Sequence, residues 1–235
     1  MEPNLLTTLA LGVLLGMEHA LDADHVVAVS TMVSRHRTLR RSSFVGIFWG
    51  LGHTMTLFLV GLAVILFKVR IPEPLALSME FLVGIVLVTL GASVVKGYLT
   101  RRVHAHIHRH GGEIHLHFHS HAAGEDHDHE HRLPQHRQSL LVGMIHGLAG
   151  SAPLMLLVLA TIRAPMLGLL YTLVFGAGSI LGMLGISTLL GLPFLLTAER
   201  FARIHQKIRI VVGAASVAYG VWIMAYVGIG KGLFR

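Results

Sequence analysis

The chain alternates between long runs of apolar residues and shorter polar segments. Six runs are long enough to cross a ~30 Å hydrocarbon core as helices, since a helix rises ~1.5 Å per residue. They cover residues 5–33, 44–67, 75 or 81 to 99, 140–162, 166–196 and 210–228. This pattern predicts an all-α integral membrane protein with six transmembrane helices.

Composition supports a membrane protein and limits its chemistry. Of the 235 residues, 53% are hydrophobic and 13% are charged, whereas a soluble domain carries about 25% charged residues. The chain has no cysteine, which excludes disulfides and thiolate ligands and leaves imidazole, carboxylate, thioether and carbonyl groups. No nucleic-acid motif accompanies the net charge of +7, so we expect no nucleic-acid partner.

Five ionisable side chains interrupt the first apolar run: Glu18, His19, Asp22, Asp24 and His25. Burying such groups in lipid is costly unless they pair, face water or hold a cation. Polar residues also lock membrane helices together, but one or two suffice for that purpose. We therefore interpret the cluster as functional.

The first run is also longer than the membrane requires. Its 29 residues would make a helix of ~44 Å, so it either tilts or breaks near residues 20–24. On an unbroken helix Glu18, Asp22 and His25 share one stripe, and Asp24 points to the other side. After a break, Asp22 or Asp24 would cap the second half-helix, and Asp24 would reach the same cavity.

Two further histidines stand in apolar runs. His53 follows a groove of small residues in the second span and is a candidate ligand, whereas His146 precedes a run of small residues in the fourth. We assign Glu18 and His146 to orienting the ligands or relaying the ion. Pro153 predicts a kink or a break in the fourth span, and residues 198–209 are expected to form an amphipathic loop.

The polar segment of residues 100–139 is rich in histidine at alternate positions. This spacing suits an extended or disordered tract with many weak sites, although a solvated linker would show it too. We favour weak, labile binding of Ni²⁺, Co²⁺ or Zn²⁺, since neutral imidazole suits all three. The segment holds twelve histidines, and His136 near its end is not among the candidate ligands. The candidates are His104, His106, His108, His110, His115, His117, His119, His121, His127, His129 and His131.

Lysine and arginine predict the orientation of the chain. Fourteen of them lie in the first, third and fifth polar segments and five on the other side, which places the first group in the cytoplasm. With six spans, both termini then lie outside the cytoplasmic membrane, and the histidine-rich loop faces the cytoplasm.

The two halves of the chain repeat weakly. Residues 16–21 match 143–148, residues 50–53 align with 176–179, and glycines 84 and 91 match glycines 213 and 220. Three spans per half is an odd number, so the copies must have opposite topology, as in the inverted repeats of secondary transporters. We expect a first three-helix repeat over residues 1–99, the histidine-rich loop over 100–139, and a second repeat over 140–235.

At His19-Ala20-Leu21-Asp22-Ala23-Asp24-His25 the sequence resembles the nickel/cobalt permease family, whose signature is a histidine, four residues and then Asp-His. Residues 51–54, Leu-Gly-His-Thr, are similar to the second histidine motif of that family. Residues 143–152 look like its short relatives of the urease accessory protein H type, which are nickel-transport-like. The resemblance implies that His19, Asp24, His25 and His53 handle the metal, with Asp22 in the same motif.

The residues and the resemblance together predict a secondary transporter for nickel or cobalt uptake rather than an enzyme. Nitrogen and oxygen ligands would replace the hydration water of the ion near the midplane. No Walker A sequence occurs, so the membrane potential is the expected drive, and protons should compete with the metal near pH 6. No resident cofactor is expected; the partners are the divalent ion, the lipid bilayer and a cytoplasmic metallochaperone.

The sequence is also compatible with three other functions. Efflux of nickel or cobalt by proton antiport would use the same fold and the same cytoplasmic loop. A membrane-embedded metalloenzyme is less favoured because the chain has no HExxH sequence. Met17, Met55 and Met144 would suit a Cu(I) path, but lipid-compatible packing explains them as well.

Overall fold

The computed structural model describes residues 5–36, 38–67, 71–99, 104–110, 113–119, 134–161, 165–200 and 202–234. Helices dominate the described residues, and one short hairpin adds two strands. The elements are α1 (Leu5–His19), α2 (Ala23–Val33), α3 (Leu39–Phe67), α4 (Glu73–Leu99), β1 (His104–His110), β2 (Glu113–His119), α5 (Gln135–Thr161), α6 (Pro165–Arg200), α7 (Ala202–Ala225) and the π-helix η1 (Tyr226–Gly230).

The helices have the length and composition of membrane spans. Within the described residues, four segments are long and apolar enough to cross a bilayer: Leu39–Phe67, Glu73–Gly97, Met166–Thr197 and Arg203–Gly230. Two shorter apolar helices, Leu9–His19 and Ala23–Val33, add to them. The chain is therefore an all-α, multi-pass integral membrane protein.

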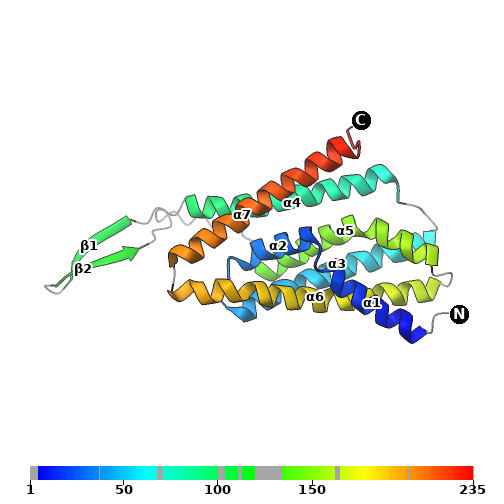
Figure 1. Cartoon of the computed structure of the whole chain (residues 1–235), viewed down its shortest axis with the longest axis horizontal. Coiled ribbons are helices and arrows are strands. Elements are labelled where there is room, and N and C mark those ends of the chain that lie inside the picture. Colours follow the sequence, from blue (N-terminus) through cyan, green and yellow to red (C-terminus); the bar gives the residue numbers. More distant parts are fainter. Residues whose placement is uncertain are drawn as a thin grey trace.

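The first apolar run is broken, as one of the two alternatives predicted. α1 ends at His19 and α2 begins at Ala23, and Figure 1 shows the two half-helices following one another along the bundle. Of the kink or break predicted at Pro153, the break is wrong, because α5 continues without interruption to Thr161. A helix in lipid keeps its remaining backbone hydrogen bonds because no water is present to replace them.

The expected loop over residues 198–209 is also wrong. α6 extends to Arg200 and α7 begins at Ala202, so helix occupies nearly all of that segment. Basic side chains do not break a helix, because their long stems carry the charge toward water while the backbone stays helical. The composition of the segment marks the membrane boundary and not the end of a helix.

Glycines allow the helices of the bundle to pack backbone against backbone. α3 lies against both α5 and α6, and α1 lies along α6. A Cβ atom on Gly16 of α1 would collide with the carbonyl oxygen of Phe175 in α6, and one on Gly143 of α5 with that of Trp49 in α3. These close approaches bury Trp49 and Met183 completely in the core.

α4 and α7 form a second close pair, and Figure 1 shows them together along one side of the bundle. A Cβ atom built on Gly84 would lie 2.9 Å from the carbonyl oxygen of Gly220, and one built on Gly220 would lie 2.6 Å from that of Gly84. Gly91 and Gly213 face each other in the same way. The two helices therefore touch through their backbones at two levels.

The strands β1 and β2 form an antiparallel hairpin within the histidine-rich segment. Figure 1 places it beyond the end of the bundle that lies opposite the two chain termini. Its register pairs His104 with His119, His106 with His117, and His108 with His115. The extended backbone agrees with the alternating spacing, while residues 121, 127, 129 and 131 lie outside the described residues.

Candidate metal centre

The break between α1 and α2 creates the centre of the site. The turn is tight, because the N–H of Leu21 donates to the carbonyl of Glu18 at 2.8 Å and that of Asp22 to His19 at 3.1 Å. Asp22 is the N-cap residue of α2, and its carbonyl accepts from the N–H of Val26 at 3.0 Å. Its side chain makes no capping hydrogen bond and is free to serve another group.

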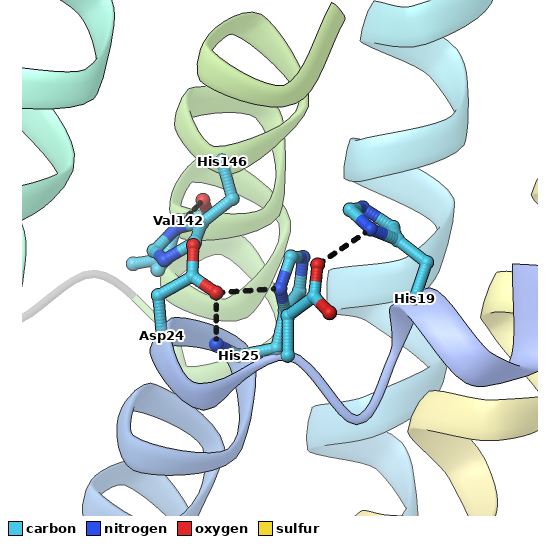
Figure 2. Close-up of polar contacts among 6 residues, drawn as sticks. His19, Asp24, His25, Val142 and His146 are labelled. Atoms are coloured by element: carbon cyan, nitrogen blue, oxygen red, sulfur yellow. Dashed lines mark hydrogen bonds and ion pairs between the residues drawn. The ribbon is translucent and has the colours of Figure 1, made fainter. Parts of the chain in front are cut away.

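Two carboxylates of this turn bind two imidazoles. Oδ2 of Asp22 lies 2.8 Å from Nδ1 of His19, and Oδ1 of Asp24 lies 3.1 Å from Nδ1 of His25 (Figure 2). Asp24 also accepts the backbone N–H of His25 at 3.0 Å. Because a carboxylate only accepts, each Nδ1 donates, and in the neutral form of the ring Nε2 then keeps the free lone pair.

A third imidazole meets these two from α3. The ring centroid of His53 lies 5.2 Å from that of His19 and 5.2 Å from that of His25, and the His19 and His25 rings are 4.7 Å apart. His53 is fully buried, and neither of its ring nitrogens has a hydrogen-bond partner. One potential ligand atom from each of the three rings lies within 4.8 Å of the others.

His146 approaches from α5, as Figure 2 shows. Its Nδ1 lies 3.1 Å from the carbonyl oxygen of Val142 and donates to it, so Nε2 again keeps the lone pair. That Nε2 is buried without a partner, and the ring lies 5.4 Å from His25 and 4.7 Å from Trp49. His146 thus belongs to the same cluster.

The acidic side chains make a second group of donors that shares His25. Atoms of Asp22, Asp24 and His25 lie within 4.8 Å of one another. Asp22 is more than half exposed and Asp24 less than a third, so this group faces outward from the buried imidazoles. Glu18 is exposed and lines the same cavity, but it belongs to neither group of potential ligands.

A cavity of about 650 Å³ opens onto the cluster, and it is lined by His19, Asp22, Asp24, His25 and His146 among others. Its wall from α5 is formed by small residues. A Cβ atom on Gly150 would lie 3.8 Å from Nε2 of His19, and one on Gly147 would lie 2.6 Å from the carbonyl oxygen of His53. α5 therefore packs tightly against the backbone of α3 at Gly147, whereas a methyl group at Gly150 would only touch the ring of His19.

This arrangement fits a borderline divalent transition metal. Histidines that bind metal usually donate their second ring N–H to a carboxylate or a carbonyl, and His19, His25 and His146 all show that pattern. Two nitrogens bound to one tetrahedral metal lie ~3.4 Å apart, since each bond is ~2.1 Å, so the three rings would have to draw together by about 1 Å to complete the site. Neutral imidazole suits Ni²⁺, Co²⁺ and Zn²⁺ alike.

The fold and this cluster define a polytopic α-helical membrane protein with a buried centre of imidazoles and carboxylates. The chain is 42% identical to the urease accessory protein UreH of Bacillus sp. (strain TB-90), over all of this chain and 97% of that one. It also matches the family described as cytochrome C biogenesis protein transmembrane region over residues 23–222. The chain belongs to the family of urease accessory protein UreH, within that wider group of membrane proteins. No solved structure matches it.

These relationships confirm the family resemblance read from the motifs and the expectation of a membrane protein with an accessory role rather than an enzyme. The roles of the individual residues remain predictions, and the structure brings His19, Asp22, Asp24, His25, His53 and His146 together. Trp49 and Phe175 were missed, although their rings lie 4.7 Å from His146 and 5.4 Å from His19. Trp49 precedes His53 by one helical turn, and that spacing was an available signal.

Proposed function

We propose that this chain is a secondary transporter that carries divalent transition-metal ions, nickel or cobalt, into the cell across the cytoplasmic membrane. The nitrogen ligands are His19, His25 and His53, and Asp22 and Asp24 orient the rings and neutralise the charge of the ion. His146 and Glu18 receive or pass on the ion at the edges of the cluster. In keeping with the name of the relative, the imported metal supplies a urease, through a cytoplasmic metallochaperone.

One observation carries this proposal: three imidazoles converge at a helix break inside an apolar bundle and leave buried nitrogens without partners. Buried polar atoms are normally hydrogen-bonded, so an unpartnered group of this kind calls for a ligand. In membrane proteins, broken helices at the midplane typically mark the substrate site of a transporter.

The helix contacts support an inverted repeat of two three-helix halves. Gly16 lies against the carbonyl of Phe175, and its counterpart Gly143 lies against the carbonyl of Trp49. Phe175 and Trp49 are themselves counterparts, because each comes directly before one of the matched glycines, Gly176 and Gly50. The pair α4 and α7 is also reciprocal, through the glycines at 84, 91, 213 and 220. In this proposal, α1 with α2 corresponds to α5, α3 to α6, and α4 to α7.

The direction follows from charge. Basic residues favour the cytoplasm, so both termini lie outside and the hairpin of β1 and β2 lies inside. An ion of charge +2 that moves inward gains ~4.6 kcal/mol per 100 mV of membrane potential, which needs no nucleotide. The hairpin then presents its histidines to metal that has just arrived in the cytoplasm.

Transport by purified protein in vesicles tests the proposal. We expect Ni²⁺ uptake driven by an inside-negative potential, and a loss of most of that uptake in His19→Ala and His25→Ala. His136→Ala is the matched control, because His136 lies exposed at the start of α5, away from the cluster. Wild-type uptake in both cluster variants would show that the proposed site is wrong.

Efflux by proton antiport is the second candidate, favoured by the place of the histidine hairpin opposite the chain termini (Figure 1). Overexpression in cells separates the two directions. Import raises cellular nickel and sensitivity to nickel, whereas efflux lowers cellular nickel and raises tolerance.

A further inference from the structure

Glu80 lines the cavity beside the imidazoles but belongs to neither group of potential metal ligands. It stands in α4 and lines the cavity together with Val83 of the same helix and Asp22 of the helix break. Glu18, Asp22, Asp24 and Glu80 give this one cavity four carboxylates. Clefts with a single sign of charge concentrate ions of the opposite sign, so the cavity attracts cations.

The carboxylate of Glu80 is already paired with a cation from the chain itself. Nζ of Lys231 lies 2.6 Å from Oε2 of Glu80, and each side chain is about one-third exposed. The C-terminal turn holds the lysine there, because the N–H of Lys231 donates to the carbonyl of Tyr226 at 2.8 Å. The ring of Phe234 anchors the same turn against Phe81, with 5.3 Å between centroids.

An aromatic stack leads from this pair along the wall of the cavity. Tyr219, Trp222 and Tyr226 all line the cavity, and neighbouring rings stack at 5.4 and 5.5 Å. Nζ of Lys231 lies 5.5 Å from the centroid of Tyr226, where the face of the ring attracts cations. The lysine thus contacts both the carboxylate of Glu80 and the ring of Tyr226, two partly exposed side chains of the cavity wall. We call this end of the cavity its mouth.

We propose that Glu80 forms an outer cation site at the mouth of the cavity, and that Lys231 occupies this site and closes it until a divalent ion displaces the ammonium group. This inference rests on the proposed transport function. The site attracts hydrated divalent cations from the side where both chain termini lie, and the tethered lysine sets the metal concentration at which the mouth opens.

Exposure makes this exchange feasible. A partly exposed lysine–carboxylate pair is weakly bound and loses strength with salt, so the lysine leaves the carboxylate readily. A divalent ion carries twice the charge of the ammonium and competes for the same oxygen atoms. The released Lys231 stays attached to the C-terminal turn and returns once the ion has moved toward the imidazoles.

Two substitutions test the site with opposite expected results. Lys231→Gln frees Glu80 and should lower the Ni²⁺ concentration for half-maximal uptake by about threefold to tenfold, and Glu80→Gln should raise it by a similar factor. The double variant should behave like Glu80→Gln. Lys207→Gln is the control, because this residue lies exposed near the start of α7, at the opposite end of that helix from the turn with Lys231.

If the pair of Glu80 and Lys231 were merely structural, both single variants would have a lower maximal rate of uptake. The Ni²⁺ concentration for half-maximal uptake would then not shift in opposite directions. That outcome, or unchanged half-saturation in both, overturns the outer site while the loss of uptake in His25→Ala still supports transport. Unimpaired uptake in His25→Ala instead removes the proposed function on which this inference rests.

The absence of native cysteine provides a second readout that needs no transport. Val83→Cys places one thiol on the wall of this cavity, one helical turn from Glu80, and Ile223→Cys is the alternative if the first variant does not fold. A membrane-impermeant thiol reagent should modify this cysteine faster when Lys231→Gln is added. Equal rates with and without Lys231 overturn the closing role of the lysine.

Discussion

His19, His25 and His146 each present a single free nitrogen to the centre of the site. Their Nδ1 atoms are bound to Asp22, Asp24 and the carbonyl of Val142, so only Nε2 remains as a ligand atom. The two carboxylates therefore act first on the tautomer and the orientation of the rings. In the proposed metal site, their negative charge also offsets that of the ion in a medium of low dielectric constant.

Asparagine at either acidic position tests this role. In Asp22→Asn and Asp24→Asn the amide can donate to Nδ1, which favours the tautomer with the proton on Nε2 and removes the ligand lone pair. We expect the Ni²⁺ concentration for half-maximal uptake to rise about 10- to 100-fold in each variant. Uptake in vesicles measures it, Glu73→Gln serves as control, and unchanged values in both variants would contradict the assignment.

His36, in the loop between α2 and α3, predicts a pH dependence of stability. Burial and the nearby Arg41 and Arg35 lower the pKa of His36 to about 4. Between pH ~6.5 and 4 the unfolded chain therefore binds more protons than the folded one, so stability falls as the pH decreases through this range.

We expect the thermal midpoint in detergent to fall less between pH 7.5 and 5.0 in His36→Asn than in the wild type. The exposed His136 provides the comparison, since His136→Asn should keep the wild-type pH dependence. Equal pH dependence in wild type and His36→Asn would show that this histidine does not contribute.

The sequence could predict the residues of the cluster that are close together in the chain. His19, Asp22, Asp24 and His25 lie within seven positions, and their charge stands out against an apolar run. The pairing of Glu80 with Lys231 spans 151 positions, and no local pattern relates such residues. Only the packing of α4 against α7 brings them together.

Among the elements, the break between α1 and α2 was predictable because a run of 29 residues is longer than the membrane needs and carries charge at its centre. The choice between tilt and break was not, since it depends on neighbouring helices. Pro153 does not end its helix for a related reason. A proline removes one hydrogen bond, but the packing of a helix among others decides whether it ends there.

The contact of α5 with α3 at Gly147 should not tolerate a side chain. A Cβ atom there would lie 2.6 Å from the carbonyl of His53, so Gly147→Val must push the two helices apart. We expect a loss of about 1–3 kcal/mol in stability and reduced uptake. Gly185→Val is the control, because no atom lies within 4 Å of a Cβ at that position, and the thermal midpoint should stay unchanged.

The hairpin of β1 and β2 should respond to metal and acid. Its register places the histidines at 104, 106, 108, 115, 117 and 119 opposite one another in pairs, and residues opposite in a sheet share a face. Metal that bridges such pairs would stabilise the hairpin, whereas protonated pairs would repel.

Limited proteolysis of the intact protein measures this response. We expect Ni²⁺ to protect residues 104–119 at pH 7.5 but not at pH 5.5. Replacing the histidines of β2 with asparagine should remove the protection, whereas the same change at His136 should not. Protection that is independent of both metal and pH would contradict the prediction.

At the scale of the whole molecule, the principal contacts run between the two halves of the chain. α1 packs on α6, α5 on α3, and α4 on α7. Because each half packs mainly on the other, we expect the two halves to assemble even when the polar segment that joins them is cut.

Separate expression of the halves tests this dependence. Residues 1–120 and 134–235, produced together, should assemble and restore at least part of the Ni²⁺ uptake of the intact chain. Either part alone should be unstable and inactive. Recovery of a stable, folded single half would show that the contacts between halves are less important than proposed.

The backbone contacts of Gly84 with Gly220 and of Gly91 with Gly213 tie α4 to α7, and these two helices carry Glu80 and the turn with Lys231. Glu80 and Lys231 thus belong to one rigid pair of helices, and in the proposed opening only the side chain of Lys231 has to move. Such side-chain movements take nanoseconds to microseconds, whereas rearranging packed helices takes microseconds to milliseconds. In the proposed transport cycle, an ion therefore binds and leaves the outer site many times before one slow rearrangement of the helices moves it across the membrane.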